Sequence, residues 1–580
     1  MVCRNVGLKI FSFFISLIFL WALVWWMDRY SLGYQLSVYM FAWGSVGNAL
    51  PFIFLFVLGL LAFNRLIASF FVALLTGIIF FYINYKKNQY LGKPLSEEDF
   101  FFLNNLDGNA IDLFKGYVDL WLVSIFLLVF MFLTFLFVFF ENRFFIKSSK
   151  ARYVGCVIVI SVGVWFLSLG GVDKVYDFKL MRFSWNGPTS TLHAGVVSKI
   201  IYSFAKLSSA NDEPVDVQDI NFFVEKFSSI SNPVAEEYDK PDVIMIQSEA
   251  FSNPTLFNKV DDLHSLLPVY AKAIEQGNTG YMKVPTFGGG TIRTEYEVLS
   301  GVPLFALPKI EFPYMQLKAH KVETLASEFG RNGYSATAIH ANSGNFWNRK
   351  KFFERAGFDK FITIEDFPNH VVKDGFFMSD KSMTDVVINQ FANGEEKKFI
   401  FAVSIEAHGP YESNDTRKGR INKITLPDGL SAQSKIEYEN YIYHISNADA
   451  ELGRLHDYLE QRGKPYILVF YGDHLPAFNF LYKDLGFKNG LPAKAQLVPW
   501  VMFSNVQKGS LVAPESWLLG AAVVNKAKLN TSAYFQLING FSIDSKASND
   551  ERVAQALLSI ARSQSQGKFG EHIKVGGITQ

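Results

Sequence analysis

Residues 466–476 read YILVFYGDHLP, and this stretch decides how the second half of the chain folds. Six apolar or aromatic residues run from Tyr466 to Tyr471 without a polar break, as expected of a strand that is buried on both faces of a sheet. A glycine ends the run, and Asp473 and His474 follow at once. Ligands bind beyond the carboxyl ends of the strands in open α/β sheets, so these two side chains are candidate site residues.

Two further runs of the same kind lie earlier in the chain. Residues 242–247 read DVIMIQ and are followed, one residue later, by Glu249, and residues 398–404 read KFIFAVS. Helical candidates at 322–331 and 436–461 separate the three runs. This alternation predicts an α/β domain whose sheet is covered by helices on both faces.

A glycine-rich turn, FGGGTIRTE at residues 287–295, lies between the first two runs. Taken alone, it could be a flexible loop with Thr291 as a helix N-cap, or it could hold a phosphate on backbone N–H groups. It is not a P-loop, because the Gly-Lys-Ser/Thr step is missing. The side chains that follow the strands would supply two oxygens and one imidazole to a divalent metal. The Thr291 hydroxyl could be the fourth ligand, and the metal would lower its pKa.

The first 172 residues are predicted to form a transmembrane domain with five helices. Five apolar stretches are long enough to cross a bilayer, which needs about 20 residues, and they lie near residues 7–27, 46–63, 66–85, 119–140 and 153–172. No small-residue cleavage site follows the first stretch, so it is expected to remain as a helix. With five spans, the basic loops fall on one side, which is the cytoplasmic side in membrane proteins. The rest of the chain would then be extracytoplasmic.

The remaining chain is predicted to consist of a helical linker, 173–239, and a catalytic domain, 240–580, of which residues 505–580 indicate only a mixed or helical tail. The formal net charge is +1, and no strong Lys/Arg cluster supports a nucleic-acid partner. The two cysteines, Cys3 and Cys156, lie in the apolar part. The catalytic domain therefore has no disulfide, Cys-ligated zinc or thiol nucleophile.

In combination, these motifs make residues of about 240–505 resemble the alkaline-phosphatase/sulfatase superfamily. With the transmembrane domain, the chain resembles its lipoteichoic acid synthase-like branch, which includes the phosphoglycerol transferases that modify periplasmic glucans. The segment LSGVPLF at 299–305 also looks like the glucan-modifying enzymes. The motifs that carry the resemblance are Glu249, Thr291 with Glu295 four residues later, Phe346-Trp347-Asn348-Arg349 and Gly472-Asp473-His474.

The resemblance implies that Thr291 is the nucleophile. It also implies that one metal, commonly manganese, is bound by Glu249, Thr291, Asp473 and His474. Oxygen-rich ligation with one His fits manganese or magnesium and does not exclude zinc.

The resemblance makes Trp347, Arg349 and His408 contacts of the phosphoglycerol group. Arg349 can hold phosphate oxygens in a fork, and His408 could donate to a phosphate or protonate a leaving group. Without the resemblance, Trp347 reads as a core aromatic residue and Arg349 as half of a surface salt bridge. The family pattern places an acidic residue, in contact with the glycerol hydroxyls, at the position of Asn342, whose amide can still bond a hydroxyl. His340 is a further candidate pocket residue.

The function implied is a membrane-bound transferase at the outer face of a bacterial cytoplasmic membrane. It would move phosphoglycerol from phosphatidylglycerol to an envelope glycan or glycolipid through a phospho-threonine intermediate. One alternative is a phosphoethanolamine transferase, although those enzymes usually carry several disulfides in the soluble domain. A sulfatase proper would need a Cys/Ser-x-Pro-x-Arg motif, which the segment from Thr291 lacks. A non-catalytic membrane sensor or assembly protein is the last alternative, against which the complete metal-binding set argues. The acceptor stays open, as does the choice between single transfer and polymerisation.

Overall fold

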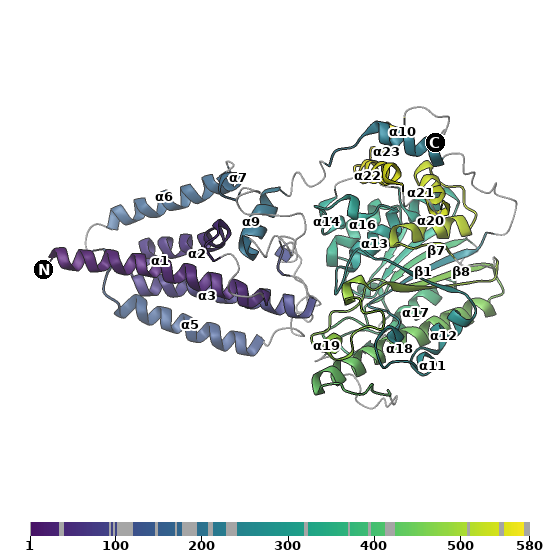
Figure 1. The fold of residues 1–580 in the computed structure, drawn as a ribbon, viewed down its shortest axis with the longest axis horizontal. Coiled ribbons are helices and arrows are strands. Elements are labelled where there is room, and N and C mark those ends of the chain that lie inside the picture. The colour runs from purple at the N-terminus through teal and green to yellow at the C-terminus, as the bar shows by residue number, and fades with distance from the viewer. Residues whose placement is uncertain are drawn as a thin grey trace. The chain divides into compact units, whose positions relative to one another are not determined.

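The computed structural model of the chain is shown in Figure 1. The described residues form two compact units, one up to Lys206 and the other from Glu213 onward. The residues that the structure describes are 2–33, 40–91, 94–96, 99–100, 120–145, 149–168, 171–176, 194–206, 213–227, 240–317, 323–368, 372–392, 396–411, 424–506, 511–544 and 550–573.

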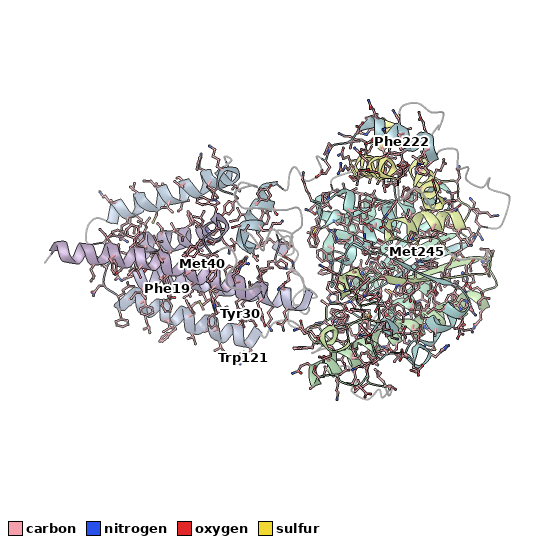
Figure 2. All side chains as sticks on the ribbon, in the orientation of Figure 1. Phe19, Tyr30, Met40, Trp121, Phe222 and Met245 are labelled. Atoms are coloured by element: carbon pink, nitrogen blue, oxygen red, sulfur yellow. The ribbon has the colours of Figure 1, made fainter. Side chains whose placement is uncertain are left out.

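The first unit is a bundle of long apolar helices: α1 (Val2–Leu32), α2 (Trp43–Phe63), α3 (Leu66–Leu91), α5 (Leu120–Phe140) and α6 (Ser149–Ser168). Large apolar side chains such as Phe19 and Trp121 are 56% and 74% exposed on its surface (Figure 2). An exposed apolar surface of this kind is typical of a membrane-facing bundle.

Four of the described helices, rather than the predicted five, are long and apolar enough to cross a membrane: Gly7–Leu32, Trp43–Phe63, Leu66–Gln89 and Val123–Phe140. The predicted fifth span, 153–172, falls on α6, and its residues 169–170 lie outside the described part of the chain. Lys150 and Arg152 stand in the first turn of α6, so the apolar length of this helix is short. The fold class is otherwise confirmed.

Polar contacts gather basic residues at one end of this bundle. The Lys9 ammonium group donates to the carbonyl oxygens of Arg143 at 3.0 Å and Phe144 at 2.8 Å. Arg152 donates to the carbonyl oxygen of Leu61 at 3.1 Å, close to the end of α2. The start of α1, the end of α2 and the segment between α5 and α6 therefore lie together.

Helix α6 runs antiparallel to α2. A Cβ added at Gly155 would meet Leu61, near the end of α2, whereas one added at Gly163 would meet Phe54, near its middle. Beyond α6, the Tyr176 hydroxyl donates to a backbone carbonyl near the start of α2. The chain thus enters α6 at the basic end of the bundle and leaves it at the opposite end.

Only parts of the predicted linker are described: the end of α7 (Gly171–Val175), α9 (Val196–Lys206) and α10 (Val217–Phe227). Helix α9 belongs to the first unit, where the Asp28 carboxylate accepts from the N–H of Val196 at 3.0 Å. Helix α10 belongs to the second unit, where Phe223 stacks on Phe541. The predicted boundaries at 173 and 239 stay predictions.

The second unit is built on a seven-stranded sheet with the order β2-β9-β8-β1-β7-β3-β4. The three apolar runs of the sequence form its three central strands, β8, β1 and β7, which are parallel. Strands β3 and β4 continue the parallel part, whereas β9 is antiparallel to both of its neighbours. The strands are β1 (Asp242–Ser248), β2 (Thr279–Met282), β3 (Ser335–His340), β4 (Lys360–Ile362), β7 (Lys398–Val403), β8 (Tyr466–Gly472) and β9 (Val498–Ser504).

Helices cover both faces of this sheet, and Met245 of β1 lies at the centre of the unit with no exposed surface (Figures 1 and 2). The predicted helices at 322–331 and 436–461 correspond to α15 (Leu325–Arg331) and α18 (Ala432–Gln461), although residue 322 lies outside the described ranges. The tail after β9 is helical where it is described. One face carries α13 (Thr291–Ser300), α20 (Ser516–Lys526), α21 (Ala533–Ile543) and α22 (Glu551–Ser565); the other carries α12 (Pro268–Glu275), α17 (Asp380–Asn389) and α18.

Candidate metal centre and nucleophile

The register of two central strands brings the candidate metal ligands together. Ser248 at the end of β1 pairs with Gly472 at the end of β8, so Glu249 and Asp473 leave the sheet at the same level. Ligand atoms of Glu249, Asp473 and His474 lie within 4.8 Å of one another, and all three residues are buried. His474 Nε2 is 3.6 Å from Glu249 Oε1 and 3.4 Å from Asp473 Oδ2.

Backbone contacts fix these side chains with their ligand atoms directed at one another. Ala250, with an uncommon φ of 53°, turns the chain so that its N–H donates to Asp473 Oδ1 at 2.8 Å. His474 Nδ1 lies 3.1 Å from the Leu475 carbonyl. A carbonyl only accepts, so Nδ1 carries the proton and Nε2 presents a lone pair. Among the described residues, Asp473 Oδ2 and His474 Nε2 have no hydrogen-bond partner. Two unpartnered acceptors beside the second carboxylate, Glu249, fit a bound cation.

The electrostatics of Glu249 point the same way. Burial and the Asp473 carboxylate raise the pKa of Glu249 to about 8, against the opposing effects of His474, the hydrogen bond from Thr291 and Arg349. Two buried carboxylates without a counter-charge are costly to ionise together. A cation between them would remove that cost.

The glycine-rich turn places Thr291 against this cluster. Gly290, at φ 80°, is the N-cap of α13, and Thr291 is the first helical residue. The Thr291 hydroxyl makes no cap bond but donates to Glu249 Oε2 at 3.2 Å. The turn is also bonded to the segment that follows β8, because the N–H of Gly288 donates to the Leu475 carbonyl at 2.9 Å. Of the two readings of this turn, the N-cap role for Thr291 is wrong.

Arg349 lies buried near the cluster and is already paired. Its Nε and Nη2 groups donate to the two carboxylate oxygens of Glu295 at 2.9–3.1 Å. Its Nη1 group donates to His340 Nε2 at 3.1 Å, and His340 Nδ1 donates to the Val403 carbonyl at 3.2 Å. Burial and the Arg349 charge hold the pKa of His340 well below its ordinary value, so the ring is neutral. The surface salt bridge that sequence reasoning offered for Arg349 is wrong, because Arg349 and Glu295 are 1% and 0% exposed.

The remaining candidates differ in their surroundings. Trp347 is half-buried and stacks on Phe312, with ring centroids 4.6 Å apart. Asn342 Oδ1 accepts from the N–H of Ser343 at 2.8 Å, which leaves its amide N–H₂ group to act as a donor. His408 Nδ1 donates to the Gly409 carbonyl at 2.8 Å, so Nε2 of the neutral ring is an acceptor. Burial lowers the pKa of His408.

Two residues that support the site were not assigned a role from the sequence. Glu295 holds Arg349, and its spacing of four residues from Thr291 could have placed it on the same face of α13. Ser404 accepts from the N–H of Glu249 at 3.0 Å through its hydroxyl. Its place at the end of the β7 run is the sequence signal that could have identified Ser404, because polar residues at neighbouring strand ends meet at one edge of the sheet.

Comparison with known proteins places residues 241–531 in a family. The model described as Sulfatase matches residues 241–531. A protein of Rhizobium meliloti named for cyclic beta-1,2-glucan modification is 36% identical over 255 residues, which are 44% of this chain and 39% of that protein. Lipoteichoic acid synthase of Staphylococcus saprophyticus is 22% identical over 347 residues, 57% of this chain and 51% of that protein. The chain thus spans about half or less of the length of these two relatives.

The fold was also compared with solved structures. Streptococcus pyogenes phosphoglycerol transferase GacH in complex with sn-glycerol-1-phosphate is 20% identical to this chain, with a TM-score of 0.48. The match covers 63% of this chain and 92% of that chain.

Proposed function

This chain belongs to the sulfatase family, and we propose that it is a membrane-bound phosphoglycerol transferase with Thr291 as nucleophile. The donor is phosphatidylglycerol, the acceptor is an envelope glycan or glycolipid, and the intermediate is a phosphoglycerol ester of Thr291. One observation carries the proposal. The Thr291 hydroxyl donates at 3.2 Å to Glu249, within a cluster that also holds the unpartnered ligand atoms of Asp473 and His474.

The cluster fits one divalent cation, held by Glu249, Asp473 and His474 with the Thr291 oxygen as fourth ligand. Such a cation supplies a lowered pKa for the hydroxyl and a counter-charge for the phosphoryl group. Two carboxylates, one hydroxyl and one imidazole suit manganese first, and magnesium or zinc as alternatives.

The transfer takes place in two displacement steps, in which residues of the protein have separate roles. In the first, the Thr291 hydroxyl loses its proton and Oγ1 bonds to phosphorus, while the bond to the diacylglycerol oxygen breaks and that oxygen takes up a proton. In the second, an acceptor hydroxyl loses its proton and bonds to phosphorus, while the bond to Thr291 Oγ1 breaks and Oγ1 takes up a proton. His408 Nε2 is an acceptor in the neutral ring, so it suits the base that takes the proton of the acceptor hydroxyl. Arg349 donates to the phosphoryl oxygens, and Trp347 and Asn342 contact the glycerol.

The membrane unit brings the catalytic unit to its lipid donor. Tethering an enzyme to the surface that holds its substrate raises their effective concentration. The end of the bundle with Lys9, Arg143 and Arg152 is cytoplasmic under the positive-inside rule. Since the chain leaves α6 at the opposite end, the catalytic unit is extracytoplasmic, on the outer side of a bacterial cytoplasmic membrane.

The acceptor is assigned to the class of envelope glycans and glycolipids. One relative is named for modification of a cyclic β-1,2-glucan and another for lipoteichoic acid synthesis. Both names concern envelope polymers with free hydroxyl groups, which is the chemistry that the second displacement needs.

Mass spectrometry of envelope glycans and lipids, from cells with and without the protein, tests this function. The expected result is a phosphoglycerol increment on a glycan or glycolipid that depends on the protein and is absent with Thr291→Ala. A phosphoethanolamine increment would replace the proposal by the alternative transferase. The absence of any increment, together with a purified protein free of metal, would support a non-catalytic role.

A further inference from the structure

Glu295 is a buried carboxylate beside the candidate metal cluster, but its oxygens bond Arg349 and are not directed at that cluster. It lies one turn after Thr291 on α13 and is fully buried. Its oxygens accept hydrogen bonds from the Arg349 guanidinium and, at 2.9 Å, from the Tyr314 hydroxyl. Burial and the Glu295 charge hold the pKa of Tyr314 well above its ordinary value, so this hydroxyl remains a donor. Donors from α16 (Arg349–Arg355) and α14 (Pro313–Gln316) therefore hold Glu295 in one place.

Arg349 keeps part of its N–H donors for a substrate. A guanidinium has five N–H groups. Glu295 accepts from Nε and from one N–H of Nη2, and His340 accepts from one N–H of Nη1. One N–H on each terminal nitrogen is left, and no described residue accepts from it. Arg349 can thus still grip phosphoryl oxygens with two donors, but its positive charge is opposed by Glu295.

The charges of the candidate ligands, Glu295, Arg349 and one divalent cation then balance. The three carboxylates at Glu249, Asp473 and Glu295 oppose Arg349 and one divalent cation, and the neutral His340 ring adds nothing. A neutral pocket takes a singly charged phosphodiester at less electrostatic cost than a phosphomonoester, which carries about −1.5 to −2 at pH 7.

Resting on the proposed function, we propose that Glu295 is a positioning residue that sets substrate class: by pairing with Arg349, it makes the site prefer phosphodiesters over phosphomonoesters. Without Glu295, the Arg349 charge faces the phosphoryl oxygens unopposed, and a dianion gains more from it than a monoanion does. The residue acts through Arg349 and needs no contact with the substrate.

The test compares two chromogenic esters on the full-length protein in detergent with manganese. The ratio of kcat/KM for p-nitrophenyl phosphate to that for bis(p-nitrophenyl) phosphate is measured for the wild type and for Glu295→Gln. The variant is expected to raise this ratio at least about tenfold, which corresponds to about 1.4 kcal/mol, because the unopposed Arg349 charge a few ångströms away stabilises a dianion more than a monoanion by at least that amount. Glu295→Asp, which restores the charge, should return the ratio towards the wild-type value.

Glu297→Gln is the matched control. Glu297 is a buried carboxylate on the same helix, but it accepts from the N–H of Leu304 and from Ser516 rather than from Arg349. This variant should leave the ratio unchanged. If Glu295→Gln lowers both activities in parallel and leaves the ratio unchanged, Glu295 is only a structural partner and the proposal is overturned.

A binding measurement separates this proposal from the proposed function. In the Thr291→Ala background, the ratio of the Kd for dimethyl phosphate to the Kd for inorganic phosphate should rise when Glu295→Gln is added. If the wild type hydrolyses neither ester, the proposed function fails, and this affinity ratio still decides the role of Glu295. An unchanged affinity ratio would overturn that role. If Glu295→Gln does not fold, Glu295→Asp and Tyr314→Phe are compared with the wild type instead. Both variants keep the negative charge at position 295, so the affinity ratio should stay at the wild-type value.

Discussion

The hydroxyl of Thr291 donates to Glu249 Oε2 across 3.2 Å, although 42 residues separate the two in the chain. One residue begins a helix after a glycine turn, and the other follows the central strand β1. The proposed nucleophile and the proposed metal ligand are therefore positioned by a helix and a strand, as a site needs when small displacements are costly.

Asp473→Asn should abolish metal binding. The substitution keeps the volume and the hydrogen bond from Ala250 but removes the charge of the unpartnered Oδ2 atom. Bound manganese, measured by elemental analysis after gel filtration, should fall from about one ion per chain to a small fraction of that, since a charged ligand is lost. Asp449→Asn is the control, because Asp449 is a buried carboxylate that accepts from Val269 and Tyr270 instead. If Asp473→Asn still holds a full equivalent of metal, the centre is elsewhere.

Metal affinity should depend on pH through Glu249. In the metal-free protein the pKa of Glu249 is about 8, so below pH 8 a metal must displace its proton. Affinity should rise about tenfold per pH unit from pH 6 to 8 and level off above, with release of up to one proton. Calorimetry in two buffers of different ionisation enthalpy measures that proton. A flat affinity between pH 6 and 8 contradicts the assignment.

The same pKa predicts the stability of the metal-free protein. The folded-state pKa is raised above the unfolded value of about 4.3, so the folded protein binds this proton more tightly. Stability from this group is full below pH 4 and is lost as pH rises towards 8. Glu249→Gln should therefore raise the Tm of the metal-free protein at pH 8, while it lowers metal affinity. A lower Tm at pH 8 would show that the Glu249 carboxylate is stabilising.

Gly472→Ala should disrupt the candidate metal centre by straining the end of β8. A Cβ at Gly472 would lie 2.0 Å from the Phe251 carbonyl oxygen, which belongs to the backbone and cannot rotate away. Because Gly472 ends β8, the strain falls on Asp473 and His474, and we expect a loss of metal with destabilisation of more than about 2 kcal/mol. Gly330→Ala is the control, since a Cβ there meets nothing within 4 Å. Equal denaturant midpoints for the two variants would contradict the prediction.

Asn342→Ala should weaken binding of the glycerol group and leave phosphodiester chemistry intact. The Asn342 amide donor is not used by its own contact with Ser343. Losing one hydrogen bond to a hydroxyl should raise the inhibition constant of sn-glycerol-1-phosphate about fivefold. Hydrolysis of bis(p-nitrophenyl) phosphate, which has no glycerol, should change little. Equal effects on both would place Asn342 at the phosphoryl group or in the scaffold.

Much of the fold followed from simple patterns. Uninterrupted apolar runs located β1, β7 and β8, because strands buried on both faces need no polar alternation. The same patterns did not predict β9, which carries Pro499 and runs antiparallel beside β8. They also predicted five spans, whereas four of the described helices meet the length and hydropathy of a span; residues 169–170 of the predicted fifth lie outside the described ranges.

For the site, the rule of strand ends found Glu249, Asp473 and His474, since a residue's place after a strand depends only on local sequence. The resemblance to the lipoteichoic acid synthase-like branch of the sulfatase superfamily is confirmed for the family, whereas the individual residue roles stay predictions. The pairing of Glu295 with Arg349 was not predictable, because 54 residues separate them and their contact depends on how α13 packs beside α16.

Capture of the covalent intermediate tests the central claim most directly. Full-length protein in detergent, with manganese and phosphatidylglycerol but no acceptor, is quenched and digested for mass spectrometry. We predict a phosphoglycerol increment on Thr291, which is absent from Thr291→Ala and is chased away when an envelope glycan is added. Turnover of phosphatidylglycerol without any modified Thr291, or with the increment on another residue, would contradict the account.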